Sequence, residues 1–228
     1  MNYWEEEVYK KKLQWNLWPF TEVISTLVHL TRDNQMLDKN VLEIGCGVGN
    51  NLIPIAKLGY SAYGIDISNY AILEANNRAV KQSIKVNFNS GNVNRLPYKS
   101  NFFSYVIDRS VLTCTTPETI TRALDEILRV LKPGGVFMAF DWFGLKHPDL
   151  EHGTYNGNDC FSNFTSGRFK NVEYITGFDF ISLSTYLQKF NELNINRIVS
   201  SNRKSEVLTE TFNFTAKKPI LVQQIDTF

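Results

Sequence analysis

The sequence has 228 residues, of which 43% are hydrophobic and 13% aromatic, and its 24 Lys and Arg residues are nearly balanced by 23 Asp and Glu. A chain of this length buries roughly 70% of its unfolded surface as one domain, so it needs neither a disulfide framework nor a structural metal. The net charge of +1 lacks the basic excess of dedicated nucleic-acid binders, and no apolar run approaches the roughly 20 residues of a membrane span. We therefore expect no nucleic-acid partner and no membrane.

The cysteines and histidines also indicate a chain without a metal or disulfides. Cys46, Cys114 and Cys160 form no Cys-x-x-Cys pair, and the histidines lack the His-Glu-x-x-His spacing of a zinc site. An odd number of thiols fits a reducing compartment. The start of the chain shows no basic and apolar leader, so we expect a cytoplasmic protein, with monomer and homodimer both open.

Residues 1–39 are expected to form a helical segment ahead of the core. Apolar residues recur at helical spacing over 4–15 and again over 20–31. Pro19 separates the two helices, because the residue before a proline is disfavoured in a helix.

Over residues 40–141, short apolar segments alternate with amphipathic ones. Gly59 is expected to stop the first helix, Ser68 to cap the second, and Pro117 to open the third. Strands that alternate with helices predict a parallel sheet with helices on both faces. The expected strands are 41–44, 63–66, 84–88, 105–108 and 136–141, and the expected helices are 51–58, 70–81 and 117–131.

Residues 142–181 break this rhythm with many aromatic residues among Gly, Asn and Ser. A long structureless stretch inside a compact domain is usually functional, so we interpret it as an insertion or lid over a ligand site, with simple surface packing as the alternative. Residues 182–228 are expected to complete the same domain. Ser182 or Ser184 caps a helix that reaches Leu193, and two closing strands follow at 195–200 and 210–216.

A glycine turn after the first strand carries the clearest chemical signal. Gly45, Gly47 and Gly49 let the backbone approach a ligand, and the helix that follows offers free N–H groups. Asn50 stands where the dinucleotide fingerprint G-x-G-x-x-G has its third glycine. Asp66, at the end of the second strand, can accept both hydroxyls of a ribose. These features alone leave NAD and S-adenosylmethionine both open.

Four segments in order resemble class I S-adenosylmethionine-dependent methyltransferases. The segment 41–49 is similar to the family's first motif, and 64–68 to its ribose-binding strand end. Residues 91–93, followed by Leu96-Pro97-Tyr98, resemble its adenine-binding segment, and 128–135 resemble the turn before its fifth strand. The resemblance implies a Rossmann-like three-layer αβα sandwich. Its seven-stranded, mostly parallel sheet has the order 3-2-1-4-5-7-6, with the last strand antiparallel.

The same resemblance assigns roles to matching positions. Glu43 would orient the glycine loop and approach the methionyl amino group, and the loop itself would pass close to the methionine part of S-adenosylmethionine. Asp66 would bind the ribose and Ile67 would pack on the adenine. Asn92 would meet the adenine amino group, where the family usually has Asp, and the Val93 N–H would meet a ring nitrogen. The expected cofactor contacts are Glu43, Gly45, Cys46, Gly47, Asn50, Asp66, Ile67, Asn92, Val93 and Asp108, and no metal is expected.

Each of these roles has a structural alternative. Glu43 can cap the glycine loop, Asp66 can start the next helix, and Asn92 can be an ordinary turn residue. Asp108, at the end of the fourth strand near the expected transfer centre, can instead accept the N–H of Ser110 or Val111.

The methyl group of S-adenosylmethionine is activated by its sulfonium, so the protein mainly positions the acceptor, and a hydroxyl acceptor also needs a base. The candidate bases are Asp108, Asp141, His147 and His152. We hypothesise that one of the two histidines is the base, because both follow the fifth strand at the ligand-binding edge of the sheet. Surface placement is the alternative for both.

The acceptor is the least defined part of the prediction. The sequence after the fourth strand lacks the Asn/Asp-Pro-Pro-aromatic motif of enzymes that methylate amides or base amino groups. We expect oxygen methylation of a polar small molecule, such as a sugar, nucleotide sugar or phosphorylated metabolite, with S-adenosylhomocysteine as the by-product. Candidate acceptor contacts are Arg109, Trp18 and Trp142. A nucleic-acid or protein methyltransferase, a catalytically silent cofactor-binding subunit and an NAD-dependent oxidoreductase remain alternatives.

Overall fold

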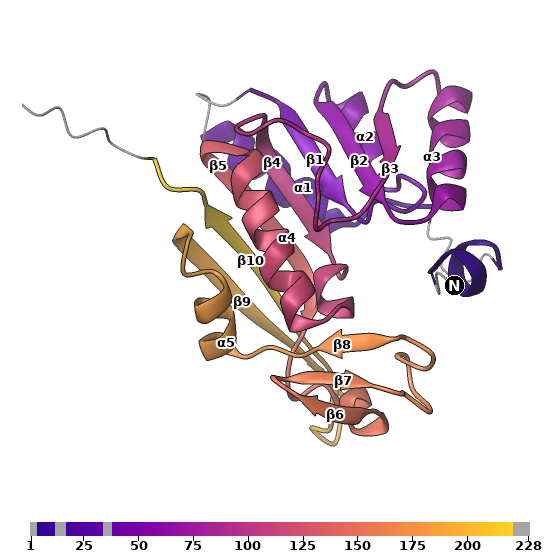
Figure 1. Cartoon of the computed structure of the whole chain (residues 1–228), viewed down its shortest axis with the longest axis vertical. Helices are drawn as coiled ribbons and strands as arrows, with labels where there is room; N and C mark the ends of the chain where they lie inside the picture. The colour runs from indigo at the N-terminus through magenta and orange to yellow at the C-terminus, as the bar shows by residue number, and fades with distance from the viewer. Residues whose placement is uncertain (1–3, 12–16, 34–37, 221–228) are drawn as a thin grey trace, which may run out of the picture.

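The computed structural model describes residues 4–11, 17–33 and 38–220, and its centre is a seven-stranded sheet between two layers of helices (Figure 1). The first four strands are β1 (Asn40–Ile44), β2 (Ser61–Asp66), β3 (Asn87–Ser90) and β4 (Phe103–Arg109). The sheet is completed by β5 (Leu131–Phe143), β9 (Asn191–Ser201) and β10 (Val207–Lys217). The α-helices are α1 (Thr21–Asp33), α2 (Leu52–Lys57), α3 (Asn69–Lys81), α4 (Pro117–Val130) and α5 (Phe180–Tyr186).

The strand order is β3-β2-β1-β4-β5-β10-β9, which confirms the predicted topology with β10 and β9 as the seventh and sixth strands. Strands β1 to β5 pair in parallel, whereas β10 is antiparallel to both β5 and β9. Since the parallel strands run in one direction, their carboxyl ends meet at one edge of the sheet, where open α/β folds bind ligands.

Successive residues of each central strand point to opposite faces of the sheet, and each face has its own hydrophobic core. Leu42 and Val106 pack with α4 and α5 on one face of the sheet. Val41 and Ile107, their neighbours along the same strands, pack with α1, α2 and α3 on the other. This period-2 alternation between two buried faces explains why the strands are apolar throughout.

Two of the predicted helix starts are confirmed by capping contacts. The Ser68 hydroxyl accepts a hydrogen bond from the Ala71 N–H at 3.1 Å at the start of α3. Thr116 caps α4, with Pro117 in the first turn. The last helix differs from the prediction, because Asp179 rather than Ser182 or Ser184 is the cap and α5 ends at Tyr186. Asp179 and Ser182 form a reciprocal capping box, which fixes the start three residues earlier.

The insertion is more regular than its composition predicted. It contains a short 3₁₀ helix η3 (Pro148–His152) and a second sheet, β6 (Thr154–Gly157), β7 (Cys160–Ser162) and β8 (Tyr174–Thr176), in the order β6-β7-β8. This sheet lies beyond the end of α4 (Figure 1). It has its own apolar cluster, formed by Leu150, Phe164, Phe169, Val172 and Ile175. Phe164 and Phe169 therefore belong to a small core within the insertion, whereas Trp142 and Phe178 pack in the main core.

The N-terminal segment also departs from the prediction. Residues Trp4–Tyr9 form a single π-helical segment, η1, where a helix over 4–15 was expected, and residues 12–15 lie outside the described residues. The expected second helix is present as α1, which begins two residues after Pro19. Within the described ranges, no helix is both long and apolar enough to cross a lipid bilayer.

Candidate functional site

A single cavity of about 1310 Å³ runs along the carboxyl edge of the sheet, from the glycine turn to the insertion. Small-molecule pockets are commonly about 300–1,000 Å³, so this cavity has room for a cofactor and a second ligand side by side. We call the part next to β1 and β2 the cofactor half. The part next to the end of β5 and the insertion is the acceptor half.

The glycine turn contains two positions, Gly45 and Gly47, at which a residue with a side chain would not fit. Gly45 and Gly47 have φ angles of +59° and +52°, in the left-handed region that disfavours other residues. A Cβ atom on Gly45 would lie 2.2 Å from Val111 Cγ2, and one on Gly47 would lie 2.9 Å from the Tyr9 hydroxyl. Gly45, Cys46, Gly47 and Asn50, which the sequence analysis expects to contact the cofactor, all line the cavity.

Asp66 stands beside this turn at the end of β2. Its carboxylate accepts hydrogen bonds from the Gly47 N–H at 2.8 Å and the Ser68 N–H at 2.9 Å. Burial raises the pKa of this carboxyl group, while the Ser68 and Gly47 N–H groups act in the opposite direction. Asp66 therefore fixes the turn and also presents an acceptor to the cavity.

Glu43 lies under the turn with an unsatisfied oxygen. The Asn51 amide donates to Oε1 at 2.6 Å, whereas Oε2 is buried and has no hydrogen-bond partner among the described residues. Burial raises the pKa of Glu43 to about 8, against smaller opposing effects from Asn51 and Arg109. A cationic group entering the cavity would satisfy Oε2 and favour the ionised carboxylate.

The third side of the cofactor half is formed by Ile67, Asn92 and Val93, which all line the cavity. Ile67 is half exposed there, as expected of a residue that packs on a flat ligand. The Asn92 side-chain oxygen accepts the Asn94 N–H at 2.8 Å. The Asn92 side chain thus stabilises the turn in which it lies. Its amide nitrogen is also a hydrogen-bond donor, which an Asp side chain would lack.

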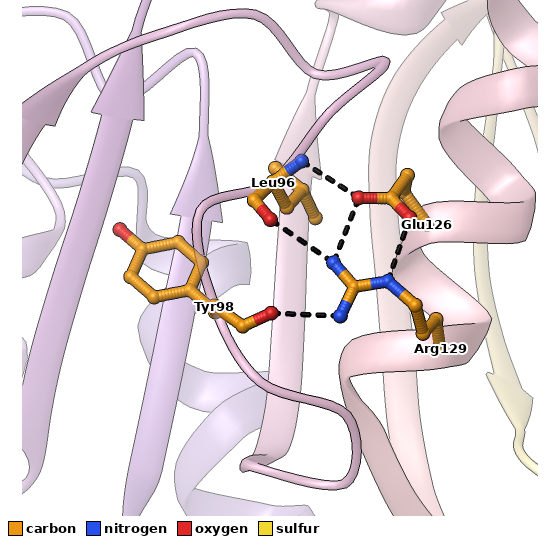
Figure 2. Close-up of polar contacts among 4 residues, drawn as sticks. All are labelled: Leu96, Tyr98, Glu126 and Arg129. Carbon is orange, nitrogen blue, oxygen red and sulfur yellow. Dashed lines mark hydrogen bonds and ion pairs between the residues drawn. The ribbon is translucent and has the colours of Figure 1, made fainter.

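The segment after Asn92 is held against α4 by one arginine (Figure 2). Arg129 donates to the carbonyl oxygens of Leu96 at 3.0 Å and Tyr98 at 2.7 Å. Glu126, paired with Arg129 at 2.7 Å, accepts the Leu96 N–H at 2.7 Å. These contacts fix the backbone of the segment that borders the cofactor half. They also join two of the four motifs in space, because Leu96-Pro97-Tyr98 lies against the end of α4 that carries Arg129.

Asp108 and Trp142 lie behind the cavity wall. Both are fully buried, and the Trp142 indole donates to Asp108 Oδ2 at 2.6 Å. Asp108 also accepts the N–H groups of Val111 and Leu112, which is the structural alternative considered for it. Burial raises the pKa of Asp108 to about 6, opposed by these three donors. The two residues join the ends of β4 and β5, and neither lines the cavity.

The structure does not bring the two candidate histidines to the cavity. His147 is buried between Phe143 and Phe169, and its Nδ1 accepts the Asp149 N–H at 3.2 Å. Burial and the nearby Arg168 lower the pKa of His147 to about 4. His152 ends the 3₁₀ helix of the insertion. Trp18, the remaining candidate acceptor contact, is 79% exposed and also lies outside the cavity lining.

Asp141 is the one candidate base of the four that lines the cavity. Asp141 and Ser110 both have a φ of 54°, an unfavourable conformation for these residues that costs roughly 1 kcal/mol or more each. Hydrogen bonds hold the strained backbone, because Asn213 accepts the Asp141 N–H and the Ser110 hydroxyl donates to the Asp141 carbonyl. The effect is to turn the Asp141 side chain into the cavity at the end of β5.

Arg109 completes this corner of the acceptor half. Its guanidinium pairs with Asp141 Oδ2 at 2.9 Å and lies 3.3 Å from the centre of the Phe20 ring. Stacking and ion pairing fix the orientation of both charged groups before any ligand arrives. The sequence analysis names Arg109 as a candidate acceptor contact, and the structure shows it already paired.

The rest of the acceptor half consists of residues that the sequence analysis did not identify. They come from the loop after β4, from α4, from the insertion and from β10, so no local motif links them. Many carry hydroxyl groups: Thr115, Thr116, Thr119, Tyr174, Thr209 and Thr211. Arg168, Glu173 and Phe169 add two charges of opposite sign and an aromatic wall from the insertion.

Residues 41–135 match the family model described as a methyltransferase domain. Residues 41–135 are thus similar to a methyltransferase domain, and the order of the strands in the sheet is the Rossmann-like one that the four motifs predicted. Among the described residues, no cluster of three or more His, Cys, Asp or Glu side chains is arranged to hold a metal ion.

Particular relatives share this domain but differ in length. The sterol 24-C-methyltransferase erg6 of Schizosaccharomyces pombe is 35% identical over 105 residues, which are 45% of this chain and 27% of that protein. The tRNA N(3)-methylcytidine methyltransferase Mettl2 of Drosophila melanogaster is 29% identical over 136 residues, which are 55% of this chain and 41% of that protein. The chain thus spans well under half the length of these two relatives.

The fold continues beyond the matched region. A solved S-adenosylmethionine-dependent methyltransferase from Methanosarcina mazei superposes with a TM-score of 0.70 at 22% identity, covering 89% of this chain and 99% of that one. At this level of identity the likeness is one of fold, and its coverage is wider than residues 41–135.

Proposed function

We propose that the protein transfers a methyl group from S-adenosylmethionine to an oxygen of a polar, uncharged small molecule. The observation that carries this proposal is the cavity itself, in which an unsatisfied buried carboxylate at Glu43 and a hydroxyl-rich, charge-balanced wall face the same space. The Glu43 end fits a cationic amino acid, and the opposite end fits a neutral molecule with several hydroxyls.

The residues of the cofactor half fit S-adenosylmethionine part by part. Glu43 Oε2 has no partner, and once Glu43 is ionised this oxygen can accept hydrogen bonds from the ammonium group; the close approach at Gly47 admits the methionine chain. Asp66 supplies an acceptor for ribose hydroxyls, and Ile67 a surface for adenine. When bound, the sulfonium would supply a methyl group that needs no further activation.

The charges of the acceptor half favour a neutral acceptor over a phosphorylated one. Arg109 is paired with Asp141, and Arg168 is paired with Asp149 at 3.0 Å, so neither arginine stands as an uncompensated anion site. Hydroxyl side chains suit an acceptor rich in hydroxyls, which they bind as donors and acceptors. Of the three classes that the sequence suggested, we therefore favour a sugar or a similar polyhydroxylated molecule.

The relatives do not decide the acceptor. One is named for a sterol carbon and another for a nitrogen of tRNA. Phe143, Phe169 and Val172 also line the acceptor half, and the hydroxyl groups beside them favour an acceptor with several hydroxyls over a sterol. The balanced net charge, with Arg197 held by the buried Glu210 at 2.5 Å, argues against a nucleic acid.

Asp141 is our choice for the base. A carboxylate can accept the hydroxyl proton of the acceptor while the oxygen forms its bond to the methyl carbon and the sulfur–methyl bond breaks, leaving S-adenosylhomocysteine. The end of β5 lies three strand spacings from Asp66 at the end of β2, a separation of roughly 14 Å. That separation leaves space between ribose and base for the transferring methyl group.

The test is an acceptor panel read by mass spectrometry. The protein is incubated with S-adenosylmethionine and, separately, glucose, glucose 6-phosphate, UDP-glucose, cholesterol and a tRNA pool. A mass gain of one methyl group on an uncharged hydroxylated compound, with matching S-adenosylhomocysteine, supports the proposal. Methylation confined to the sterol or the tRNA overturns the acceptor class. Failure to bind S-adenosylmethionine in calorimetry overturns the cofactor.

A further inference from the structure

Asp66 carries one hydrogen bond that the fold does not require. Two of its donors, the N–H groups of Gly47 and Ser68, belong to the turn and the helix that it organises. The third is the hydroxyl of Tyr9, 3.4 Å from Oδ2 and 57 residues away along the chain. This hydroxyl arrives from η1, outside the Rossmann-like core.

Tyr9 lies inside the cofactor half of the cavity. Its hydroxyl would be 2.9 Å from a Cβ atom on Gly47, so it occupies the space that the missing side chain leaves open. Tyr9 and Trp4 both line the cavity. Burial, followed by the charge of Asp66, raises the pKa of Tyr9 well above its usual value, so the hydroxyl keeps its proton and acts as a donor.

A ribose cannot use Asp66 fully while Tyr9 is in place. Ribose hydroxyls bind an acidic residue at this position by donating to its oxygens. Oδ2 already receives the Gly47 N–H and the Tyr9 hydroxyl, which occupy both of its lone pairs, and Oδ1 receives the Ser68 N–H. The Tyr9 hydroxyl thus has the same chemistry, a neutral O–H donor, as the ligand group expected there.

The segment that carries Tyr9 is short and packs on α3. η1 is six residues long, and Val8 is its one buried residue. Its charged side chains pair within the segment, with Lys10 bound to Glu6 at 2.6 Å. Short segments with little buried apolar surface open at low free-energy cost.

We propose that Tyr9 is a ribose mimic that closes the cofactor half, and that S-adenosylmethionine must displace its hydroxyl from Asp66 to bind. This inference rests on the proposed function. Tyr9 is then a residue that sets cofactor affinity, because the measured affinity is reduced by the fraction of molecules in which Asp66 is occupied. Binding moves η1 away from the glycine turn and opens the cavity toward Trp4.

The test compares wild type, Tyr9→Phe and the matched control Tyr155→Phe by calorimetry with S-adenosylhomocysteine and with adenosine. Tyr155 is exposed on the small sheet and does not line the cavity. We expect Tyr9→Phe to bind both ligands about three- to tenfold more tightly, because one hydrogen bond to a charged acceptor no longer competes. The control should bind as wild type does.

An unchanged or weaker affinity of Tyr9→Phe overturns the inference while leaving the proposed function intact. If neither wild type nor Tyr9→Phe binds S-adenosylhomocysteine or S-adenosylmethionine, the proposed cofactor itself fails, and the role of Tyr9 fails with it. Amide hydrogen exchange of the unmodified chain gives an independent measurement. Exchange in residues 4–11 should rise when S-adenosylhomocysteine is added, and equal or slower exchange counts against displacement.

Discussion

The two halves of the cavity are built by different means. The cofactor half centres on backbone: a tight glycine turn, held by Asp66 and supported by Glu43, lies within 24 residues of sequence, and Asn92 and Val93 border it. The acceptor half consists of side chains from the loop after β4, the insertion and β10, which meet only after folding. A ligand site made of local backbone leaves a readable sequence pattern, whereas one assembled from distant side chains does not.

The two halves also differ in how they hold charge. In the cofactor half, Glu43 is buried with an unsatisfied oxygen, and its pKa is raised to about 8. In the acceptor half, Arg109 and Asp141 neutralise each other near the surface of the cavity. The buried Glu43 carboxyl group fits a ligand cation, and the Arg109–Asp141 pair fits a neutral molecule next to a carboxylate.

The strongest expected effect separates chemistry from binding. Asp141→Asn keeps the shape of the side chain but removes the proton acceptor, so turnover with the acceptor found in the panel should fall about 100- to 10,000-fold. Affinity for S-adenosylhomocysteine should stay within about twofold, because Asp141 lies in the other half. Thr209→Ser, on the same wall, serves as the control. Turnover within threefold of wild type would remove Asp141 as the base.

The corresponding change in the cofactor half should weaken cofactor binding. Asp66→Ala removes the ribose acceptor and frees the Gly47 N–H, so affinity for S-adenosylhomocysteine should fall about 100-fold or more. Calorimetry measures the loss, and thermal denaturation checks that the fold remains. Asp66→Asn, which keeps one acceptor oxygen, should give an intermediate value. An Asp66→Ala variant that binds like wild type would show that the ribose lies elsewhere.

A smaller effect concerns pH. The free protein holds a proton on Glu43 below a pKa of about 8, whereas a bound ammonium group favours the ionised form, so binding must release a proton. Affinity for S-adenosylhomocysteine should therefore rise by up to about tenfold per unit between pH 6 and 8 and then level off. Calorimetry in buffers of different ionisation enthalpy counts the proton.

Glu43→Gln should remove this pH dependence and bind more weakly at pH 8. Glu173→Gln, which lies in the acceptor half, should keep the dependence. An equally steep pH dependence in Glu43→Gln would mean that another group releases the proton.

The smallest expected effect is on the stability of the insertion. Burial and Arg168 lower the pKa of His147 to about 4, below the ordinary value of 6.5, so the unfolded chain binds its proton more readily. The stabilisation is present above pH 6.5 and is lost as the pH falls toward 4, by at most about 1.4 kcal/mol per pH unit. Chemical denaturation at several pH values measures this slope.

His147→Gln should flatten that part of the profile, and His152→Gln on the same 3₁₀ helix serves as the matched control variant. Cofactor affinity should be the same in both variants, because neither histidine lines the cavity. Loss of turnover in His147→Gln at neutral pH, with the fold intact, would return this residue to the list of candidate bases.

The sequence predicted the fold and the cofactor half because both depend on local signals. Apolar segments at period two, Ser68 as a cap and Pro117 at a helix start each act within a few residues, and the structure confirms them. The sheet order was predicted from the family resemblance, and the structure confirms it. The positive φ angles of Gly45, Gly47 and Gly49 confirm the predicted glycine turn.

Apart from Arg109 and Asp141, the acceptor half could not be predicted, because burial in the insertion is decided by long-range packing. His147 and Trp142 follow or end β5 in sequence, which suggested that they face the ligand. Trp142 instead turns inward to meet Asp108, and His147 packs in an aromatic cluster. Asp141 faces the cavity because its backbone is left-handed. Glycine and asparagine are the residues that usually indicate such a conformation, and neither stands at this position, so the sequence did not predict it.

The bond between the Trp142 indole and Asp108 gives the protein an internal optical probe. The carboxyl group titrates with a pKa of about 6, and the indole that donates to it is shielded from water. Its near-ultraviolet circular dichroism should change as the carboxyl group takes up a proton. The junction between two strand ends, close to the predicted site of methyl transfer, can thus be monitored in the unlabelled chain.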